Sequence, residues 1–451
     1  MKHTVWHRLD NASKIFPAVA NLRDTKVFRL TVELTCAVNP DYLQQAASLT
    51  QSEFPPFRMQ LRRGVFWYYF EETDRKIEVG PETDQICAPL YIKGERQLPF
   101  RVIYYGRRIN LEVFHGLCDG EAALSFLLNL LTRYLLLSHP ELQLKLAEVL
   151  PPQSSLQQRA DDSFARYFRR SGKPGAAIGA RAGRKDRPGP DGKGSSPARP
   201  RRKALWRQEK ACQQSGRYPD DSRRVIVTEG TVPLAGLLQL AHQYDCTLTE
   251  YLCALLMYCL YQQQPRLAHP LPLVIEVPIN LRAIFPSQTA RNFFAVSRVT
   301  CHSADPGLVT LETLIPVVRQ AFQTNLDPQA LARKVSGLMQ MEVNPLVSLV
   351  PIPLKDQLLK LSHKLADQAV TSNLSNLGIF RLDPRLLPYV CSVSAVTSVR
   401  RPQLLVASLG QTISLTFSSP YVETELMRLF FTQLSQAGLA VEISSNLEIQ
   451  A

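Results

Sequence analysis

The segment 171–203 constrains the fold more than any other feature, because it cannot form a hydrophobic core. It holds seven Gly and five Pro, and Ile178 is its only large aliphatic residue. Such a composition buries too little apolar surface to offset the entropy lost on ordering. We therefore predict a disordered basic linker at 171–203. The 451 residues of the chain suit two folded parts, which we expect at 1–170 and 204–451.

The linker region also accounts for the chain's positive charge. Residues 169–207 carry thirteen Lys or Arg against two acids, a charge of +11 out of the chain's +13. No aromatic residue lies between Phe168 and Trp206, so base stacking has no support and we expect no nucleic-acid partner. We interpret the segment as a solvated loop. Contact with CoA phosphates or an acidic membrane surface stays an open alternative.

Cysteines, histidines and hydropathy restrict the class of protein further. The nine cysteines include no Cys-x-x-Cys pair and the histidines show no metal spacing, so we expect reduced thiols and no metal site. The N-terminus lacks the apolar core of a signal peptide. The most apolar run, 122–137, contains Asn129 and Arg133 and is short for a membrane span, which favours a buried helix. These features predict a cytoplasmic protein without a transmembrane segment.

Both halves of the chain mix strands with helices, which predicts an α+β fold. Residues 28–35 alternate as in a half-buried strand, and a strand at 109–114 runs directly into His115. An apolar helix then begins after Gly120 and ends near Ser138. The expected strands of the second half are 224–228, 273–279, 369–374, 389–397, 402–408, 411–417 and 440–443. Its expected helices are 232–243, 249–263, 307–325, 327–340 and 423–438.

The run His115-Gly116-Leu117-Cys118-Asp119-Gly120 lies between the strand and the apolar helix of the first half. Acyl transfer requires a base that removes a proton from the attacking group, and imidazole titrates near working pH. A carboxylate four residues later can fix the loop, and two glycines allow a sharp bend. The pattern favours His115 as a general base.

Simpler interpretations of the same run remain open. Asp119 could be only a helix N-cap, Gly120 only a turn residue, and His115 a satisfied core histidine. Cys118 could be imagined as a nucleophile, but direct transfer needs no covalent intermediate, and we expect a small buried thiol.

Four stretches together resemble the CoA-dependent acyltransferase superfamily with the chloramphenicol-acetyltransferase-like fold. They are His115 to Gly120, similar to HxxxDG; Val277-Pro278-Ile279-Asn280-Leu281-Arg282; Arg291-Asn292-Phe293-Phe294; and Thr371-Ser372-Asn373-Leu374-Ser375-Asn376-Leu377-Gly378. Phe114 stands where condensation domains carry a second histidine, and the Asp-Phe-Gly-Trp-Gly element of plant members is missing. The resemblance is therefore closest to the alcohol acetyltransferase and condensation-domain-like branch.

The resemblance implies two subdomains, each a mixed sheet flanked by helices, with an active-site tunnel between them. His115 would be the catalytic base, and Asp119 and Gly120 would brace the site, with Arg282 paired to Asp119. A buried carboxylate needs such a partner. Possible contacts to the oxyanion or the acceptor are Asn280, Asn292, Ser372, Ser375 and Asn376.

The expected activity is transfer of an acyl group from acyl-CoA to a small alcohol or amine, with acyl-CoA as co-substrate and no permanently bound cofactor. Two alternatives remain. One is a condensation-like enzyme that takes its acyl group from a phosphopantetheine carrier protein, and the other is a degenerate, non-catalytic member of the fold.

Overall fold

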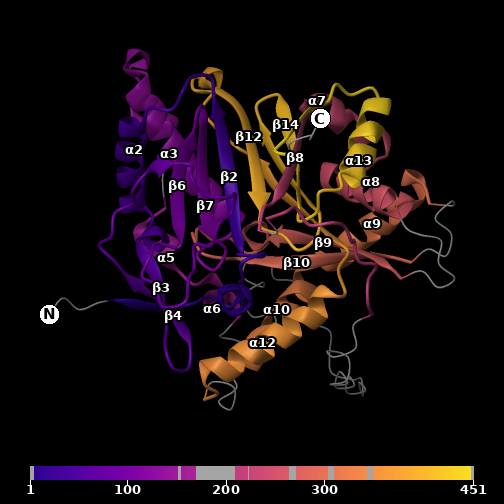
Figure 1. Cartoon of the computed structure of the whole chain (residues 1–451), viewed down its shortest axis with the longest axis horizontal. Helices are drawn as coiled ribbons and strands as arrows, with labels where there is room; N and C mark the ends of the chain where they lie inside the picture. The colour runs from indigo at the N-terminus through magenta and orange to yellow at the C-terminus, as the bar shows by residue number, and fades with distance from the viewer. Residues whose placement is uncertain are drawn as a thin grey trace, which may run out of the picture.

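The computed structural model describes residues 5–150, 154–168, 209–221, 223–263, 271–302, 309–342 and 349–447. These residues form an α+β protein in which two large mixed sheets lie side by side and are flanked by helices (Figure 1). The predicted fold class is confirmed. The linker predicted at 171–203 lies outside the described residues.

The sheet of the N-terminal half has five strands in the order β12-β2-β7-β6-β5. Gly106 joins β6 to β7 with a φ of 55°, in the left-handed region that favours glycine in tight hairpins. The strands are β2 (Val27–Leu34), β5 (Gly80–Pro81), β6 (Phe100–Tyr105), β7 (Arg108–Phe114) and β12 (Val390–Thr397). The strand expected at 109–114 is thus β7, and it ends one residue before His115.

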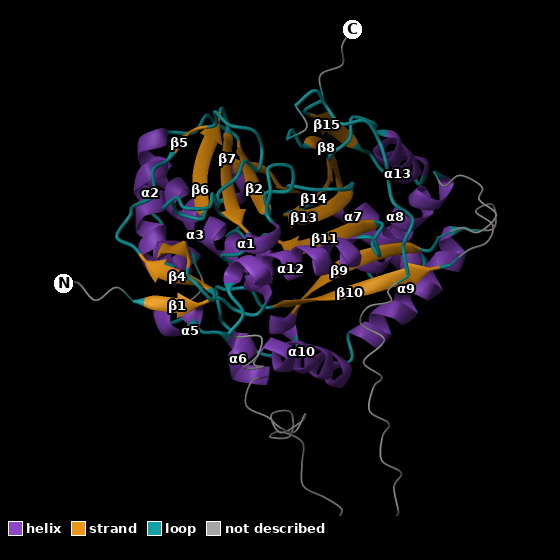
Figure 2. Cartoon of the chain, turned by 60° about the horizontal axis from the view of Figure 1, so that its bottom comes forward, coloured by secondary structure: helices purple, strands orange, loops and turns teal. Residues whose placement is uncertain are grey.

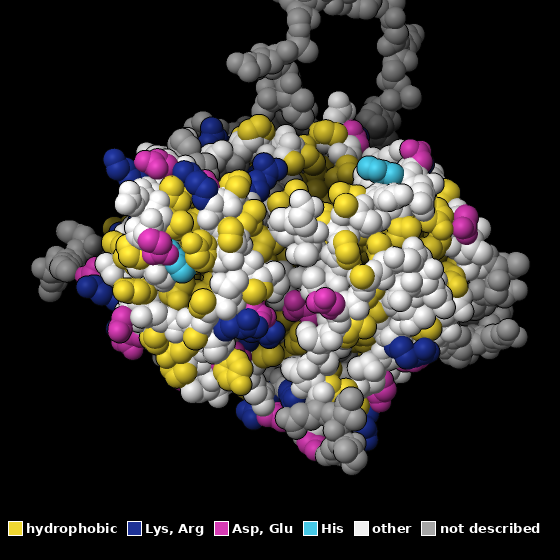
Figure 3. Space-filling view, turned by 90° about the horizontal axis from the view of Figure 1, so that it is seen from above, with side chains coloured by type: hydrophobic (Ala, Val, Ile, Leu, Met, Phe, Trp, Pro, Cys, Tyr) yellow, Lys and Arg dark blue, Asp and Glu magenta, His cyan; other side chains and the backbone are white. Residues whose placement is uncertain are grey.

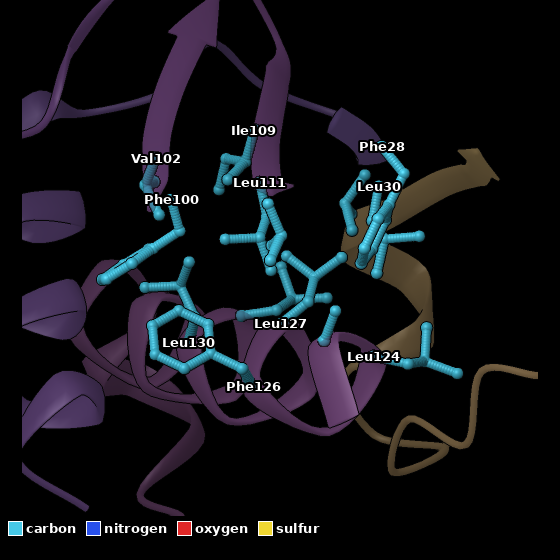
Figure 4. Packing of buried hydrophobic residues seen from close by; sticks show 14 of the residues in the cluster. Phe28, Leu30, Phe100, Val102, Ile109, Leu111, Leu124, Phe126, Leu127 and Leu130 are labelled. Carbon is cyan, nitrogen blue, oxygen red and sulfur yellow. The ribbon is translucent and has the colours of Figure 1, made fainter. Parts of the chain in front are cut away.

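Two helices cover the outer face of this sheet, α2 (Pro40–Glu53) and α3 (Gly120–Ser138). Phe126, Leu127 and Leu130 of α3 pack against Phe100 and other side chains of the sheet (Figure 4). In the described part of the chain, α3 is the one helix long and apolar enough to cross a membrane. Eleven of its residues are buried in the fold, so it is the buried helix that the sequence predicts.

The sheet of the C-terminal half has seven strands in the order β10-β9-β11-β13-β14-β8-β15. They are β8 (Ile226–Pro233), β9 (Leu273–Asn280), β10 (Phe294–Cys301), β11 (Ser372–Ile379), β13 (Gln403–Leu409), β14 (Thr412–Ser419) and β15 (Glu442–Ser445). The helices around it are α7 (Leu234–Gln243), α8 (Leu248–Gln262), α9 (Leu311–Asn325) and α13 (Glu425–Gln436). A capping box between Thr247 and Glu250 begins α8, which is buried along most of its length.

One strand of the N-terminal sheet comes from the chain beyond the predicted linker. Strand β12 belongs to the second half of the chain, yet it pairs antiparallel with β2, where Ala395 lies opposite Leu30. Both faces of β2 are largely buried, so an unpaired β2 edge would leave backbone donors and acceptors without partners. The N-terminal body therefore includes residues from 380 to 397 of the chain.

A small apolar cluster joins the halves at a second place. Phe164 and Phe168 of α6 (Ser163–Phe168) pack with Phe293 and with Leu331 of α10 (Pro328–Glu342). Three further short helices lie in the described part of the N-terminal half: α1 (Phe16–Val19), α4 (Leu146–Val149) and α5 (Leu156–Ala160). Segments from both halves therefore frame the space between the sheets.

A third sheet lies at the lower edge of the molecule beside α12 (Ile352–Asp367), as Figures 1 and 2 show. Its strands are β1 (Trp6–Arg8), β4 (Tyr68–Glu72) and β3 (Met59–Arg63), in that order across the sheet. Helix α12 and strand β10 are additions to the elements expected from the sequence.

Candidate active site

His115 follows the last residue of β7, and hydrogen bonds on both sides of its backbone hold it there. Its N–H donates to the carbonyl oxygen of Lys26 at 2.8 Å. Its carbonyl oxygen accepts from the side-chain amide of Asn292 at 2.9 Å. The loop that carries the imidazole is thus tied to the N-terminal sheet and to the second half of the chain.

The glycines of the motif serve close packing, which differs from the expected sharp bend. Neither Gly116 nor Gly120 is among the positive-φ glycines of the described residues. A Cβ atom at Gly116 would overlap the buried ring of Phe114, and one at Gly120 would lie 2.6 Å from a methyl group of Leu377. Gly116 therefore excludes a side chain for steric reasons, whereas at Gly120 the end of the Leu377 side chain would have to move.

Three aromatic rings surround the imidazole of His115. Phe16 stacks on it with centroids 4.6 Å apart, Phe28 meets it edge-on at 5.3 Å, and Phe294 lies at 5.5 Å. Burial lowers the pKa of His115, and its own backbone carbonyl and Asp119 offset that shift only in part. The ring is therefore neutral at pH 7, as a base must be.

The two ring nitrogens of His115 have different surroundings. Nδ1 is buried and makes no hydrogen bond of ordinary geometry within the described residues, although the residue's own carbonyl and the Asn292 side chain lie near the ring. Nε2 is not among the buried atoms without a partner, so we infer that it is the nitrogen that faces the cavity lined by His115. With the proton on Nδ1, Nε2 can accept a proton from a molecule in that cavity.

Asp119 and Arg282 form a two-pronged ion pair across the halves of the chain. Arg282 Nη1 lies 2.7 Å from Asp119 Oδ2, and Nη2 lies 3.2 Å from Oδ1. The carboxylate also accepts from the N–H groups of Ala122 and Phe293, at 3.1 and 2.8 Å. Asp119 therefore caps α3 and also anchors the start of β10. Both of its carboxylate oxygens accept hydrogen bonds from protein groups only.

Arg282 is fixed on its other side by backbone carbonyls. Its guanidinium donates to the oxygens of Thr289 and Arg291. Asn280 caps the turn at Leu281–Ala283 by accepting from the N–H of Arg282 at 3.0 Å. The pair expected from the sequence is present, and its partners leave it no freedom to swing into the cavity.

A cavity of about 410 Å³ lies between the two sheets, with His115 in its wall. The N-terminal sheet contributes Phe28 and Leu30, and the C-terminal sheet contributes Pro278 and Val296. Its size falls in the range of small-molecule sites.

The five expected polar contacts divide into two groups. Asn280, Ser375 and Asn376 line the cavity, and the Ser375 hydroxyl makes no hydrogen bond within the described part of the chain. Asn292 and Ser372 do not line it. Asn292 is buried and holds the backbone of His115, and the Ser372 hydroxyl donates to the carbonyl of Pro402. The Asn292 amide nitrogen and the Ser372 hydroxyl are bonded to protein groups, and a direct substrate contact by these two residues stays a prediction.

Cys118 lies in the motif but not in the cavity wall. It is fully buried, and burial raises the pKa of its thiol well above the ordinary value. The thiol is therefore protonated at pH 7 and a poor nucleophile. Within the described residues, no cluster of His, Cys, Asp and Glu could hold a metal ion.

A second pocket, of about 270 Å³, adjoins the first and is rich in arginine. The two share Val399 and Arg400 in their walls, and Arg23, Arg223 and Arg224 line the second pocket. Arg23 lies over the ring of Tyr218 and forms no ion pair among the described residues. The sequence did not point to these arginines or to the three aromatic rings, since they come from distant segments.

No profile of a known protein family matches the chain, and no curated protein matches it. The chain does match solved structures. TRI3 trichothecene 15-O-acetyltransferase from Fusarium sporotrichioides matches with a TM-score of 0.57 at 10% identity, over 96% of this chain and 95% of its own. TRI101 of F. sporotrichioides, complexed with coenzyme A and T-2, matches at 0.54 and 9%, over 97% and 99%.

A condensation domain is equally similar. The first condensation domain of the calcium-dependent antibiotic synthetase, in complex with a substrate analogue, matches with a TM-score of 0.59 at 12% identity, over 96% of each chain. The protein therefore has the chloramphenicol-acetyltransferase-like fold of these acetyltransferases and condensation domains, as its sequence motifs suggested.

Proposed function

We propose that this chain is an acyltransferase that moves an acyl group from acyl-CoA to a hydroxyl or amine acceptor, with His115 as general base. One observation carries the proposal. A neutral imidazole faces a cavity between the two sheets, on a loop held by Asn292 and by the Asp119–Arg282 pair. Structures of this fold include acetyltransferases, one of them in complex with coenzyme A.

The chemical step follows from the position of Nε2. The acceptor's proton passes to Nε2 as its oxygen or nitrogen attacks the thioester carbonyl, and a carbon–sulfur bond breaks in the resulting tetrahedral adduct. The imidazolium returns the proton to the departing thiolate, so the products are an ester or amide and free CoA thiol. The ring starts and ends neutral.

Ser375 is the polar side chain best suited to stabilise the developing oxyanion. Its hydroxyl lines the cavity and has no protein partner among the described residues. Asn280 and Asn376 also line the cavity, but the Asn376 amide already donates to Thr249 and its oxygen accepts from Gly378. Ser375→Ala should lower kcat by about tenfold or more, as loss of an oxyanion donor does, whereas Ser372→Ala should leave it unchanged.

The arginine pocket supports CoA as the donor. CoA carries a 3′-phosphate and a pyrophosphate, and guanidinium groups bind phosphate oxygens in pairs. The pocket with Arg23, Arg223 and Arg224 adjoins the cavity that contains His115. Arg23 forms no ion pair among the described residues, whereas Arg223 already pairs with Asp221. A carrier-bound phosphopantetheine has one phosphodiester only and would use less of this charge.

A panel of acyl-CoA thioesters with mixed alcohols and amines tests the proposal, with free thiol release as the signal. Acceptor-dependent thiol release is expected for at least one pair. Arg23→Gln should then raise KM for acyl-CoA without changing kcat, and Arg96→Gln, outside both pockets, is its control. Absence of acceptor-dependent release from the whole panel, by protein with a normal unfolding transition, would overturn the proposal.

The condensation-like alternative rests on the likeness to the condensation domain. Phe114, where such domains carry a second histidine, is buried and stacks on Tyr91, so its side chain is part of the core. Measuring kcat/KM for one acyl group, first as a CoA thioester and then as a carrier-bound thioester, distinguishes the two functions. A higher kcat/KM for the carrier-bound donor would favour the alternative.

A further inference from the structure

Helix α12 exposes a continuous leucine face, which is unusual for an amphipathic helix on a folded protein. Leu354, Leu358, Leu361 and Leu365 are 57, 56, 53 and 44% exposed, and their spacing puts them on one side of the helix. The side that packs on the protein carries Asp356, His363 and other half-buried residues. The apolar stripe therefore points outward, where it stabilises nothing within the described chain.

The turn between β3 and β4 extends this apolar surface beyond the start of α12. Val65 is 67% exposed and Trp67 50% exposed, and Phe66 lies between them. Two hydrogen bonds fix the turn to the helix: the Ile352 N–H donates to the Val65 oxygen at 2.9 Å, and Lys355 Nζ donates to the Phe66 oxygen at 2.7 Å. The leucine face and the turn thus form one rigid surface.

The charges of α12 are sorted between its two sides. Asp356 pairs with Arg63 and accepts a hydrogen bond from the Tyr68 hydroxyl. Asp367 pairs with Arg401, so both acidic side chains of the helix bind groups of the protein itself. The exposed charged residues of the helix are Lys360 and Lys364. The outward surface is therefore leucine, a tryptophan-containing turn and lysine. By contrast, the view from above in Figure 3 shows acidic and basic side chains scattered among hydrophobic ones.

We propose that the leucine face of α12 and the turn at 65–67 form an interfacial binding surface for anionic lipid membranes. Amphipathic helices that lie in a membrane interface bury an apolar face and present lysines to lipid head groups, and tryptophan is enriched at that level. The absence of outward acids matches an anionic partner. The same surface of a second copy of the chain would offer these lysines no exposed acidic residue of α12.

The position of this surface gives it a role in access to the cavity. The last turn of α12 contributes His363, Ala366 and Asp367 to the wall of the cavity that contains His115, and Figure 2 shows α12 beside α1 on this face. Docking here would place α12, and the part of the cavity wall that it forms, against the lipid surface. On the proposed acyltransferase function, an amphiphilic acceptor or a long acyl chain would then enter directly from the membrane.

Vesicle flotation of the full chain tests the proposal. The vesicles are phosphatidylcholine alone or phosphatidylcholine with about a third phosphatidylglycerol, and wild-type protein is expected to float with the anionic vesicles. The double variant Leu358→Gln/Leu361→Gln should lose at least about tenfold in partition. Lys360→Gln/Lys364→Gln should lose about fivefold for each lysine, and added salt should abolish that difference.

Leu156→Gln is the matched control, because Leu156 of α5 is as exposed as Leu361, at 53%, and lies outside this surface. It should float as wild type does. His115→Ala should also float normally, so a failure of catalysis leaves this test intact. The proposal is overturned if wild-type protein stays with neither vesicle, or if the double leucine variant floats as well as Leu156→Gln. It is equally overturned if light scattering shows a wild-type dimer that the double leucine variant converts to monomer.

Discussion

Replacing Asp119 with Asn is the most informative perturbation of the fold around the site. The amide keeps the shape of the side chain, and one oxygen can still cap α3, since Asn and Asp are comparable N-caps. The amide nitrogen, however, must face two donors. It would meet either Arg282 and the Phe293 N–H, which now bond to Oδ2, or Arg282 and the Ala122 N–H, which bond to Oδ1.

The magnitude follows from burial of the pair. The side chains of Asp119 and Arg282 are 8 and 11% exposed, so Arg282 would be left as a nearly buried charge without its ion-pair partner. Removing one partner of a buried ion pair costs about 3–5 kcal/mol. Urea unfolding should show this loss in the free energy of unfolding, with an unchanged m-value.

Glu33→Gln is the matched control. Glu33 also accepts from two arginines, Arg107 and Arg108, but these are 53 and 49% exposed. The Glu33→Gln variant should lose less than about 1 kcal/mol in its free energy of unfolding. A double-mutant cycle of Asp119→Asn with Arg282→Gln should then give a coupling energy of at least about 2 kcal/mol. An Asp119→Asn variant no less stable than Glu33→Gln would refute the reasoning.

Two further predictions concern the motif itself. Gly116→Ala should lower the free energy of unfolding by about 1–3 kcal/mol, because the new methyl group overlaps the buried Phe114 ring. Gly80→Ala, with nothing within 4 Å of its Cβ, should cost less than about 1 kcal/mol, and equal losses in denaturant titrations of the two variants would contradict the steric account. For pH, burial lowers the pKa of His115, so kcat/KM should rise with pH through a value below 6.5 and stay level above it. A rate profile with its midpoint above 7 would show that another group limits the reaction.

Local patterns predicted much of the fold because each depends on neighbouring residues. The apolar helix expected from Gly120 to Ser138 has these ends in the structure, since Asp119 caps it and Pro140 follows it. Apolar and polar residues alternate in the segment before His115, and this pattern predicts the strand that the structure has as β7. The Asp119–Arg282 pair could be predicted because the motifs that carry the two residues resemble a known family.

The remaining features depend on contacts between distant segments. The pairing of β12 with β2 joins residues more than 350 positions apart, and no local pattern indicates which sheet a strand enters. Asn292 and Ser372 are polar residues in suitable motifs, but only the structure shows that their side chains face protein partners. The ring of Phe16 beside His115 also comes from a distant segment.

The rate of thiol release by His115→Ala tests the central claim most directly. It is measured with an acyl-CoA and acceptor pair that the wild-type protein turns over, at saturating substrates and pH 7.5. The unfolding midpoint of the variant is the control for its fold, and Cys118→Ala is the control for the motif. A general base contributes about 10²–10⁴-fold. We predict that His115→Ala loses at least about a hundredfold in kcat while Cys118→Ala stays within about threefold, and a folded His115→Ala protein with wild-type kcat would contradict the account.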